Sequence, residues 1–335
     1  MRNLEIMLRK QSPRQYRTTG PRSPVREPEV RSPWSLVLLL IVLLSCRSAP
    51  MVTDTFLEET VPLEPGAFAY FFADAFGARP ILDELDIESM NNRQFRQILD
   101  STQSVIAAVY TRQDEGLTKS RFQLAAWGDY PAFRARMALG LSRGWKKQSS
   151  AGNDPPYWFS QGNGLSVLLE RQRAFITTAW DSSPKHPVTV RRTTAIPEGF
   201  GDFRRGKVFA GWLDDPGPYV SGQLQGRMNI PITIPVDTLF LGLIPIDEQL
   251  HTADEQMYTA NVRFHFNEVS HALFLMGSLS GIRRNMPLEP ESDNFALLAA
   301  LLLTNPPVRN VRTITLTSNA MSSNEIALLF SLFSL

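Results

Sequence analysis

The stretch GAFAYFFADAFGARP, residues 66–80, is echoed later in the chain by GKVFAGWLDDPGPY, residues 206–219. Each begins with glycine, continues as a short apolar run with aromatic residues, and ends in an acid and a turn, which is typical of a buried strand leading into a loop. The echo predicts an α+β fold of two similar halves, each an antiparallel sheet with packed helices. One continuous α+β domain is the alternative.

The elements of the first half follow from periodicity. Apolar residues at helical spacing in 93–110 predict an amphipathic helix, and 121–127 and 174–180 predict strands. Pro131 suits the first turn of a helix that places Phe133, Met137 and Leu141 on one face. Two short apolar runs around QGNG, residues 161–164, predict a hairpin.

The second half has a similar rhythm. The segment 231–246 is interrupted by prolines, which predicts an edge strand or several short ones. A strand at 256–266 and a helix at 268–279 follow, and then a half-buried strand at 311–321. The last helix begins at Ser322, which stands in capping-box spacing with Glu325.

Composition divides the chain into segments of different character. Residues 1–45 read as a signal peptide, 46–66 as a polar tether with three prolines, 67–180 as the first half, 181–205 as a linker and 206–335 as the second half. The chain is 43% hydrophobic and 20% charged, with a formal net charge of +1. This balance is that of a globular protein and gives no indication of nucleic-acid binding.

The only cysteine, Cys46, follows an apolar run at 34–44 that is too short to span a bilayer but has the length of a signal-peptide core. Eight basic and three acidic residues precede Cys46. The sequence Leu43-Leu44-Ser45-Cys46 resembles the lipobox of bacterial lipoproteins. A buried thiol or a residue of a short anchor helix is the other interpretation of Cys46.

The resemblance implies that Cys46 is diacylated, that cleavage occurs just before it, and that acyl chains make the membrane the protein's partner. Because Arg47 and Ser48 follow instead of Asp, the outer membrane is expected rather than the inner one. The body resembles spirochaetal envelope lipoproteins. The basic segment is long for a signal peptide, which suggests that translation begins after Met1.

The end of the chain contains two apolar segments. Residues 295–304 are apolar on every side and too short to span a bilayer, so they are expected to be buried or packed in an apolar layer. The last helix has one stripe of large apolar side chains, namely Ile326, Leu329, Phe330 and Phe333. This stripe faces the core, covers a lipid-sized cavity or contacts a membrane, and the core is preferred.

No motif establishes an activity. Ser142 lies in G-x-S-x-G, but a helix precedes it and a loop follows, the reverse of a nucleophile elbow. Ser182 and Lys185 match S-x-x-K in a proline-rich segment that does not favour a helix. His265, Glu268 and His271 do not have the spacing of metal ligands on one helix face. We therefore expect that the protein is not an enzyme and that it has neither a cofactor nor a metal site.

These observations favour an envelope lipoprotein that acts as a structural or binding module at a membrane surface, with a lipid or another envelope protein as a further partner. A carrier that encloses an apolar or lipid ligand is the first alternative. An exported serine hydrolase that uses Ser142 is the second.

Overall fold

The computed structural model describes residues 60–84, 100–114, 117–130, 132–141, 144–149, 155–162, 164–179, 183–187, 194–218, 235–246, 256–285 and 300–332. The lipobox, the signal-peptide core and Cys46 lie outside these ranges.

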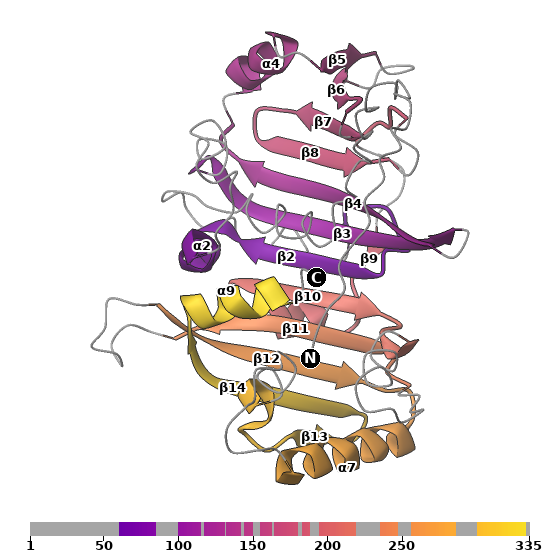
Figure 1. The fold of residues 1–335 in the computed structure, drawn as a ribbon, viewed down its shortest axis with the longest axis vertical. Helices are drawn as coiled ribbons and strands as arrows, with labels where there is room; N and C mark the ends of the chain where they lie inside the picture. Colours follow the sequence, from indigo (N-terminus) through magenta and orange to yellow (C-terminus); the bar gives the residue numbers. More distant parts are fainter. Residues whose placement is uncertain are drawn as a thin grey trace, which may run out of the picture. The chain divides into compact units, whose positions relative to one another are not determined.

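The described residues form one continuous antiparallel sheet with the strand order β13-β14-β12-β11-β10-β2-β3-β4-β8-β7-β6-β5 (Figure 1). The α+β fold with antiparallel strands and packed helices is therefore confirmed. The strands are β2 (Ala69–Asp74), β3 (Thr102–Asp114), β4 (Leu117–Gly128), β5 (Trp145–Gln148), β6 (Tyr157–Ser160), β7 (Leu165–Leu169), β8 (Arg173–Thr178), β10 (Phe209–Asp214), β11 (Thr238–Pro245), β12 (Met257–His265), β13 (Val308–Asn310) and β14 (Thr313–Ser322).

The two echoed stretches become adjacent strands near the middle of this sheet. β2 and β10 pair antiparallel, with Ala69 opposite Leu213 and Ala73 opposite Phe209. From this pair the chain builds outward in the same order on both sides, through β3 and β4 on one side and through β11 and β12 on the other. A helix follows the third strand each time, and the next paired strand returns beside it as β8 or β14.

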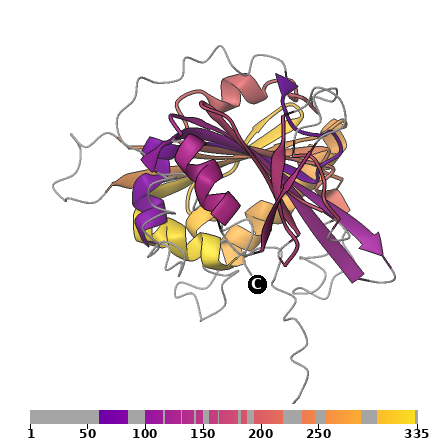
Figure 2. The same ribbon diagram turned by 90° about the horizontal axis from the view of Figure 1, so that it is seen from above.

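Four helices cover one face of the sheet, here called the helix face (Figure 2). They are α2 (Ala75–Glu84), α4 (Ala132–Leu141), α7 (Val269–Asn285) and α9 (Ser323–Leu332). Beneath them lie the alternate side chains of the strands, such as Ala73, Leu124 and Val167 under α2, α4 and α9. Val262 and Phe264 of β12 pack with Ala272 and Leu275 of α7.

The opposite face, here called the strap face, is covered by less structure. A two-stranded strap of β1 (Thr60–Val61) and β9 (Thr194–Ala195) lies on it, beside the short helix α5 (Phe200–Arg204). An aromatic cluster fills the space beneath: Tyr70 stacks on Trp212 with ring centroids 4.6 Å apart, and Phe200 meets Trp212 edge-on at 4.6 Å.

The C-terminal helix is fixed at its start by the predicted capping box. The Glu325 amide donates to Ser322 Oγ at 3.2 Å, and the Ser322 amide donates to Glu325 Oε2 at 2.8 Å. Ile326, 1% exposed, is buried in the same cluster as Ile81 and Leu82 of α2. The Tyr258 hydroxyl donates to the Gly77 carbonyl at 2.9 Å and so fixes α2 to β12.

The helix predicted for 93–110 is wrong for residues 102–110, because they belong to β3, which runs from Thr102 to Asp114. Asp100 is helical, and residues 93–99 lie outside the described residues. β3 lies near the middle of the sheet and is covered on both faces, so Val105, Ile106, Ala107 and Ala108 are all buried. A strand buried on both faces has no polar alternation. Its apolar residues therefore also fit helical spacing.

The edge strand predicted within 231–246 is also wrong. β11 pairs with β10 on one side and with β12 on the other. Pro235 precedes the strand and Pro245 is its last residue, so neither proline interrupts the ladder in between.

Two segments expected to be connections are packed on the sheet. Residues 60–66, assigned to the tether, include β1 and the buried Leu63. Residues 181–205, assigned to the linker, include β9 and α5. The remaining boundaries of the predicted segments stay predictions.

Part of the apolar segment 295–304 is described. Its residues 300–303 are helical, Leu303 is buried, and Leu301 and Leu302 pack against the core clusters of the helix face.

Two substitutions in α9 separate its packing from its cap. Ile326→Ala removes a fully buried side chain and is expected to lower the free energy of unfolding by about 2–5 kcal/mol. Ser322→Ala removes only the capping hydroxyl and is expected to cost about 1 kcal/mol. Urea unfolding followed by circular dichroism measures both, and equal costs would contradict the core position of Ile326.

Candidate functional site

The helix face exposes large apolar side chains. Of the nine large hydrophobic residues that are exposed among the described ones, seven lie on α2, α4 and α7. The other two, Val308 and Val311, lie in β13 and in the turn after it. Buried apolar faces are the rule for helices on a sheet, so three helices with exposed apolar residues on one face indicate a surface for contact.

The largest exposure is on α4. Phe133, Met137 and Leu141 are 74%, 50% and 81% exposed, and they follow one another at intervals of four residues. Four residues are just over one helical turn, so the three side chains form a stripe about 12 Å long. We call these three residues the α4 stripe. The sequence placed them on one face, and the structure shows that this face points to solvent.

The other side of α4 attaches it to the sheet. Ala135 and Leu139 pack against the core of the helix face. The Arg136 guanidinium donates to the Leu169 carbonyl through Nε at 3.0 Å and also through Nη2. The inward side thus has one leucine and one alanine, whereas the outward side has three large apolar residues, which is the opposite of the arrangement in a helix that serves only the core.

Basic side chains lie close to the α4 stripe in the chain and in the fold. Lys146 and Lys147 are both exposed on β5, which contacts α4, but neighbouring residues of a strand point to opposite faces. Lys147 lies opposite Trp158, whose ring lies beside Gly140 of α4, so Lys147 is the one on the helix face. An exposed apolar stripe with a lysine beside it has the chemistry of a helix that lies in a membrane interface, where apolar side chains enter the acyl boundary and cations meet anionic headgroups.

A second exposed set lies on α7, at the other end of the sheet (Figure 1). Val269, Leu273 and Phe274 are exposed, while Ala272 and Leu275 of the same helix are buried. Phe76 of α2 is exposed on the same face of the sheet.

The sequence proposed Ile326, Leu329, Phe330 and Phe333 of the last helix as an apolar contact. Ile326 is a core residue and does not form such a surface. The side chains of Leu329 and Phe330, and the whole of Phe333, lie outside the described residues. Cys46 lies outside them too, so its acylation stays a prediction.

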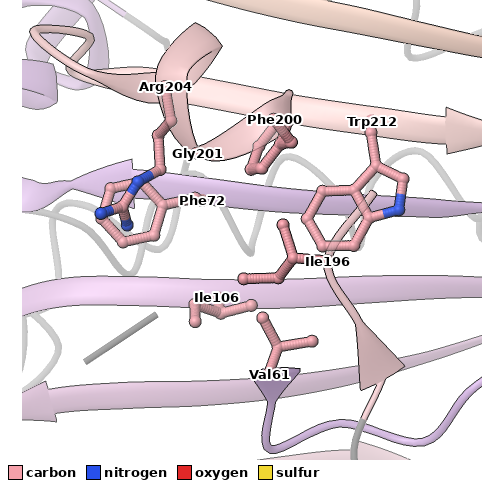
Figure 3. Close-up of a pocket in the computed structure, with 8 residues that line it drawn as sticks. All are labelled: Val61, Phe72, Ile106, Ile196, Phe200, Gly201, Arg204 and Trp212. Carbon is pink, nitrogen blue, oxygen red and sulfur yellow. The ribbon is translucent and has the colours of Figure 1, made fainter. Parts of the chain in front are cut away.

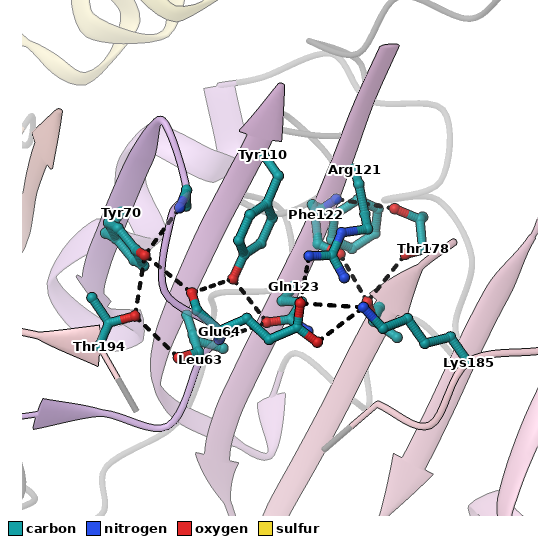
Figure 4. A network of polar contacts seen from close by, with 12 residues as sticks. Leu63, Glu64, Tyr70, Tyr110, Arg121, Phe122, Gln123, Thr178, Lys185 and Thr194 are labelled. Atoms are coloured by element: carbon teal, nitrogen blue, oxygen red, sulfur yellow. Dashed lines mark hydrogen bonds and ion pairs between the residues drawn. The ribbon is translucent and has the colours of Figure 1, made fainter. Parts of the chain in front are cut away.

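A polar cluster, here called the clamp, fixes the strap to the strap face (Figure 4). The Glu64 carboxylate accepts from Arg121 Nη2 at 2.6 Å and from Lys185 Nζ at 2.9 Å. The Glu64 amide donates to Gln123 Oε1 at 2.9 Å, and its carbonyl lies 3.0 Å from the Tyr70 hydroxyl. Arg121, only 5% exposed, also lies over the Tyr110 ring, with its Cζ 4.2 Å from the ring centroid.

The two tyrosines in the clamp act as donors. Burial raises the pKa of Tyr70 and that of Tyr110 well above the ordinary value of a phenol. Both hydroxyls therefore keep their protons at neutral pH. The Tyr110 hydroxyl lies 2.6 Å from the Glu64 carbonyl and 2.9 Å from Gln123 Oε1, and its single proton serves one of these acceptors at a time.

A small apolar pocket lies beside the strap (Figure 3). Val61 and Ile196 line it on the side of the strap, and its free space is only about 10 Å³, room for about one water molecule. Its other lining residues are Phe72, Ile106, Phe200, Gly201, Arg204 and Trp212. The Arg204 guanidinium lies over the Phe72 ring, 4.1 Å from its centroid, so the pocket is apolar with one cation at its side.

The sequence motifs with possible chemistry do not converge. His265 lies against Phe240 on the strap face, with ring centroids 4.4 Å apart and the rings tilted by 51°, whereas His271 belongs to α7 on the helix face. Glu268 lies 3.5 Å from His271 Nε2. Within the described ranges, no three His, Cys, Asp or Glu residues are grouped so that they could hold a metal ion.

The other two motifs are only partly described. Ser142 and Ser182 lie outside the described residues, while Lys185 belongs to the clamp. The helix α4 precedes Ser142 and the strand β5 follows it, which is the order opposite to a nucleophile elbow. Among the described helices, none has both the length and the apolar character needed to cross a bilayer.

Substitution of Glu64 tests the clamp. Glu64→Gln removes the carboxylate that neutralises the buried Arg121, and the expected loss of unfolding free energy is about 3 kcal/mol. Lys185→Gln is the control, because Lys185 is about one-third exposed and its loss is expected to cost less than about 1 kcal/mol. Urea midpoints of the two variants compare the costs. A smaller effect at Glu64 than at Lys185 would show that the clamp does not stabilise the fold.

Solved structures of one protein share this fold. Crystal form III of TP0453, an envelope lipoprotein of the spirochaete Treponema pallidum, has a TM-score of 0.52 and 14% identity, over 80% of this chain and 96% of that one. Form IV has a TM-score of 0.50 and 16% identity, over 81% and 94%. No family model matches the sequence, and the curated proteins contain no significant match. At these identities the likeness shows the fold alone: the chain has the antiparallel α+β fold of TP0453.

Proposed function

We propose that the protein is an envelope lipoprotein, tethered through acylated Cys46, that lays its helix face on a membrane surface and acts there as a binding module. The lipobox resemblance and the shared fold with the envelope lipoprotein TP0453 support the location. The absence of Asp after Cys46 favours the outer membrane within this proposal.

The α4 stripe is the observation that carries the proposal. Transfer of a large apolar side chain out of water contributes about 1.5–3 kcal/mol, so three such side chains add a contact of moderate strength. An acyl anchor already holds the body near the lipid, and a second weak contact then acts within the same molecule at high effective concentration. In a tethered protein, exposed apolar side chains of this kind are therefore sufficient to hold the body against the membrane surface.

A carrier function is the second candidate, and the pocket beside the strap supports it. The pocket is apolar, but its free space of about 10 Å³ has room for about one water molecule, far less than the roughly 300–1,000 Å³ that is usual for small-molecule sites. A lipid tail would need the strap to move outward. The proposal includes no catalytic step, since the order of elements around Ser142 does not favour a nucleophile.

Charged substitutions in the α4 stripe test the membrane contact. Phe133→Glu and Leu141→Glu each place a carboxylate where an apolar side chain would enter lipid, so partition onto anionic liposomes is expected to fall at least tenfold. Because both residues are largely exposed, the urea midpoint should change little. Flotation of residues 47–335, without acyl chains, measures the partition.

Val308→Glu is the matched control. Val308 is also apolar and 63% exposed, but it lies on the edge strand β13. Flotation of this variant should equal that of the unsubstituted protein. If all three variants float equally well, the stripe does not contact the membrane and the proposed docking surface is wrong.

The anchor has its own test. Cys46→Ala removes the thiol that the lipobox resemblance implies is acylated, so incorporation of a labelled fatty acid should be abolished and the protein should stay uncleaved or leave the membrane. Metabolic labelling in a bacterial host measures this, with Ser48→Ala as a control that keeps the label. Label retained by Cys46→Ala would exclude Cys46 as the acylated residue.

A further inference from the structure

Two cations meet on the strap face, at the end of the sheet away from the clamp. Arg263 is on β12, on the side of that strand that also presents Asn261 and His265. Lys207 follows α5 and reaches the same region from above β10 and β11. Both side chains are half-buried.

The two cations share one aromatic ring. Lys207 Nζ is 4.2 Å from the centroid of Phe203, and Arg263 Cζ is 5.2 Å from the same centroid. Burial and the neighbouring Arg263 charge lower the pKa of Lys207. The two positive charges therefore repel each other, although both side chains lie at the Phe203 ring.

The described residues do not neutralise this pair. Lys207 donates to the Phe203 carbonyl, and Arg263 has no hydrogen bond or ion pair with any described residue. Arg205, on the same turn of chain, provides the contrast, since it pairs with Asp202 at 3.2 Å. Half-buried cations normally have a carboxylate or several acceptors, so two without one indicate an absent anion.

Polar atoms on both sides of Arg263 lack partners as well. Asn261 Oδ1 and His265 Nε2 are buried and without a hydrogen bond to the described residues. Residues two apart on a strand are neighbours on one face, so Asn261 and His265 flank Arg263 along β12. Most buried polar atoms in proteins are bonded, so these two exceptions beside one unpaired arginine mark an incomplete polar site. An anion there would accept from His265 in the tautomer with the proton on Nε2, and from Asn261 with its amide turned to present Nδ2.

Gly242 provides the room that this arrangement needs. It lies opposite Asn261 in the ladder, and a Cβ at this position would collide with the Lys207 side chain. The lysine crosses β11 at this point because the strand has no side chain there. The backbone is therefore shaped to hold Lys207 over the sheet.

We propose that Lys207 and Arg263, flanked by Asn261 and His265, bind the phosphate group of a phosphate monoester. A monoester carries a charge of about −1.5 to −2 at neutral pH, which matches two cations, whereas a carboxylate neutralises only one. Arginine presents paired N–H groups that suit a phosphate, and lysine adds a point charge. The monoester comes either from a soluble metabolite or from a lipid headgroup.

Titration of the full-length protein in neutral detergent tests the site. Glycerol 3-phosphate, followed by calorimetry at low salt, is expected to bind, and Arg263→Gln and Lys207→Gln should each weaken binding at least tenfold. Arg205→Gln is the matched control: it removes the same charge from a neighbouring position and should leave the affinity unchanged. Circular dichroism confirms that each variant is folded.

A second experiment with vesicles shows whether the phosphate monoester is a lipid headgroup or a soluble compound. Liposomes of phosphatidylcholine with phosphatidic acid are compared with liposomes of equal charge made with phosphatidylglycerol, which is a diester. Tighter binding to phosphatidic acid that depends on Arg263 indicates the lipid headgroup, and an Arg263-dependent response to glycerol 3-phosphate alone indicates a soluble monoester. The proposal is overturned if neither arm depends on Arg263, or if Arg205→Gln weakens binding as much as Arg263→Gln does.

Discussion

The fold depends on one cross-strand contact between its two central strands. Gly211 of β10 lies opposite Phe71 of β2, and a Cβ on Gly211 would come within 2.7 Å of the Phe71 ring and 2.8 Å of the Tyr70 carbonyl. The glycine allows the Phe71 ring to lie across β10, where it stacks on Phe209 at 5.7 Å. On the other face of the same pair, Tyr70 stacks on Trp212. Because every other strand is added outward from β2 and β10, this register determines which side chains reach the helix face and which reach the strap face.

Sequence patterns predicted best the elements that are bounded by clear turn or capping residues. The echoed stretches, the hairpin at 157–170 and the capping box at Ser322 have strong local signals, and the structure contains all of them. β3 was mistaken for a helix because burial on both faces removes the alternation that distinguishes a strand. The prolines in 231–246 suggested an edge strand, because the sequence does not show where the hydrogen-bonded ladder begins and ends. In the structure β11 begins after Pro235 and ends at Pro245, so a central strand tolerates both.

The candidate surfaces were only partly accessible to sequence reasoning. Periodicity placed Phe133, Met137 and Leu141 on one side of a helix, but not which side the sheet would take. That choice is made by Ala135, Leu139 and Arg136, whose contacts come from strands distant in the chain. The clamp joins Glu64 to Arg121 and Lys185 across gaps of 57 and 121 residues, and the two cations of the phosphate site meet only because α5 lies over β11. No local pattern predicts contacts of that separation.

The position of the clamp has a mechanical consequence. The residues between Cys46 and Thr60 can span at most about 50 Å, so in a protein anchored at Cys46 a pull beyond that length would be transmitted to β1 and then to Glu64. The load arrives along the strap and acts on the Glu64 contacts with Arg121, Lys185 and Gln123 together. Arg121 and Gln123 belong to β4, so these contacts pass the load into that strand before it reaches β2 along the chain. In a protein held by Cys46, the clamp would therefore direct a pull on the anchor into β4 as well as into β2, so that no single strand carries the whole load.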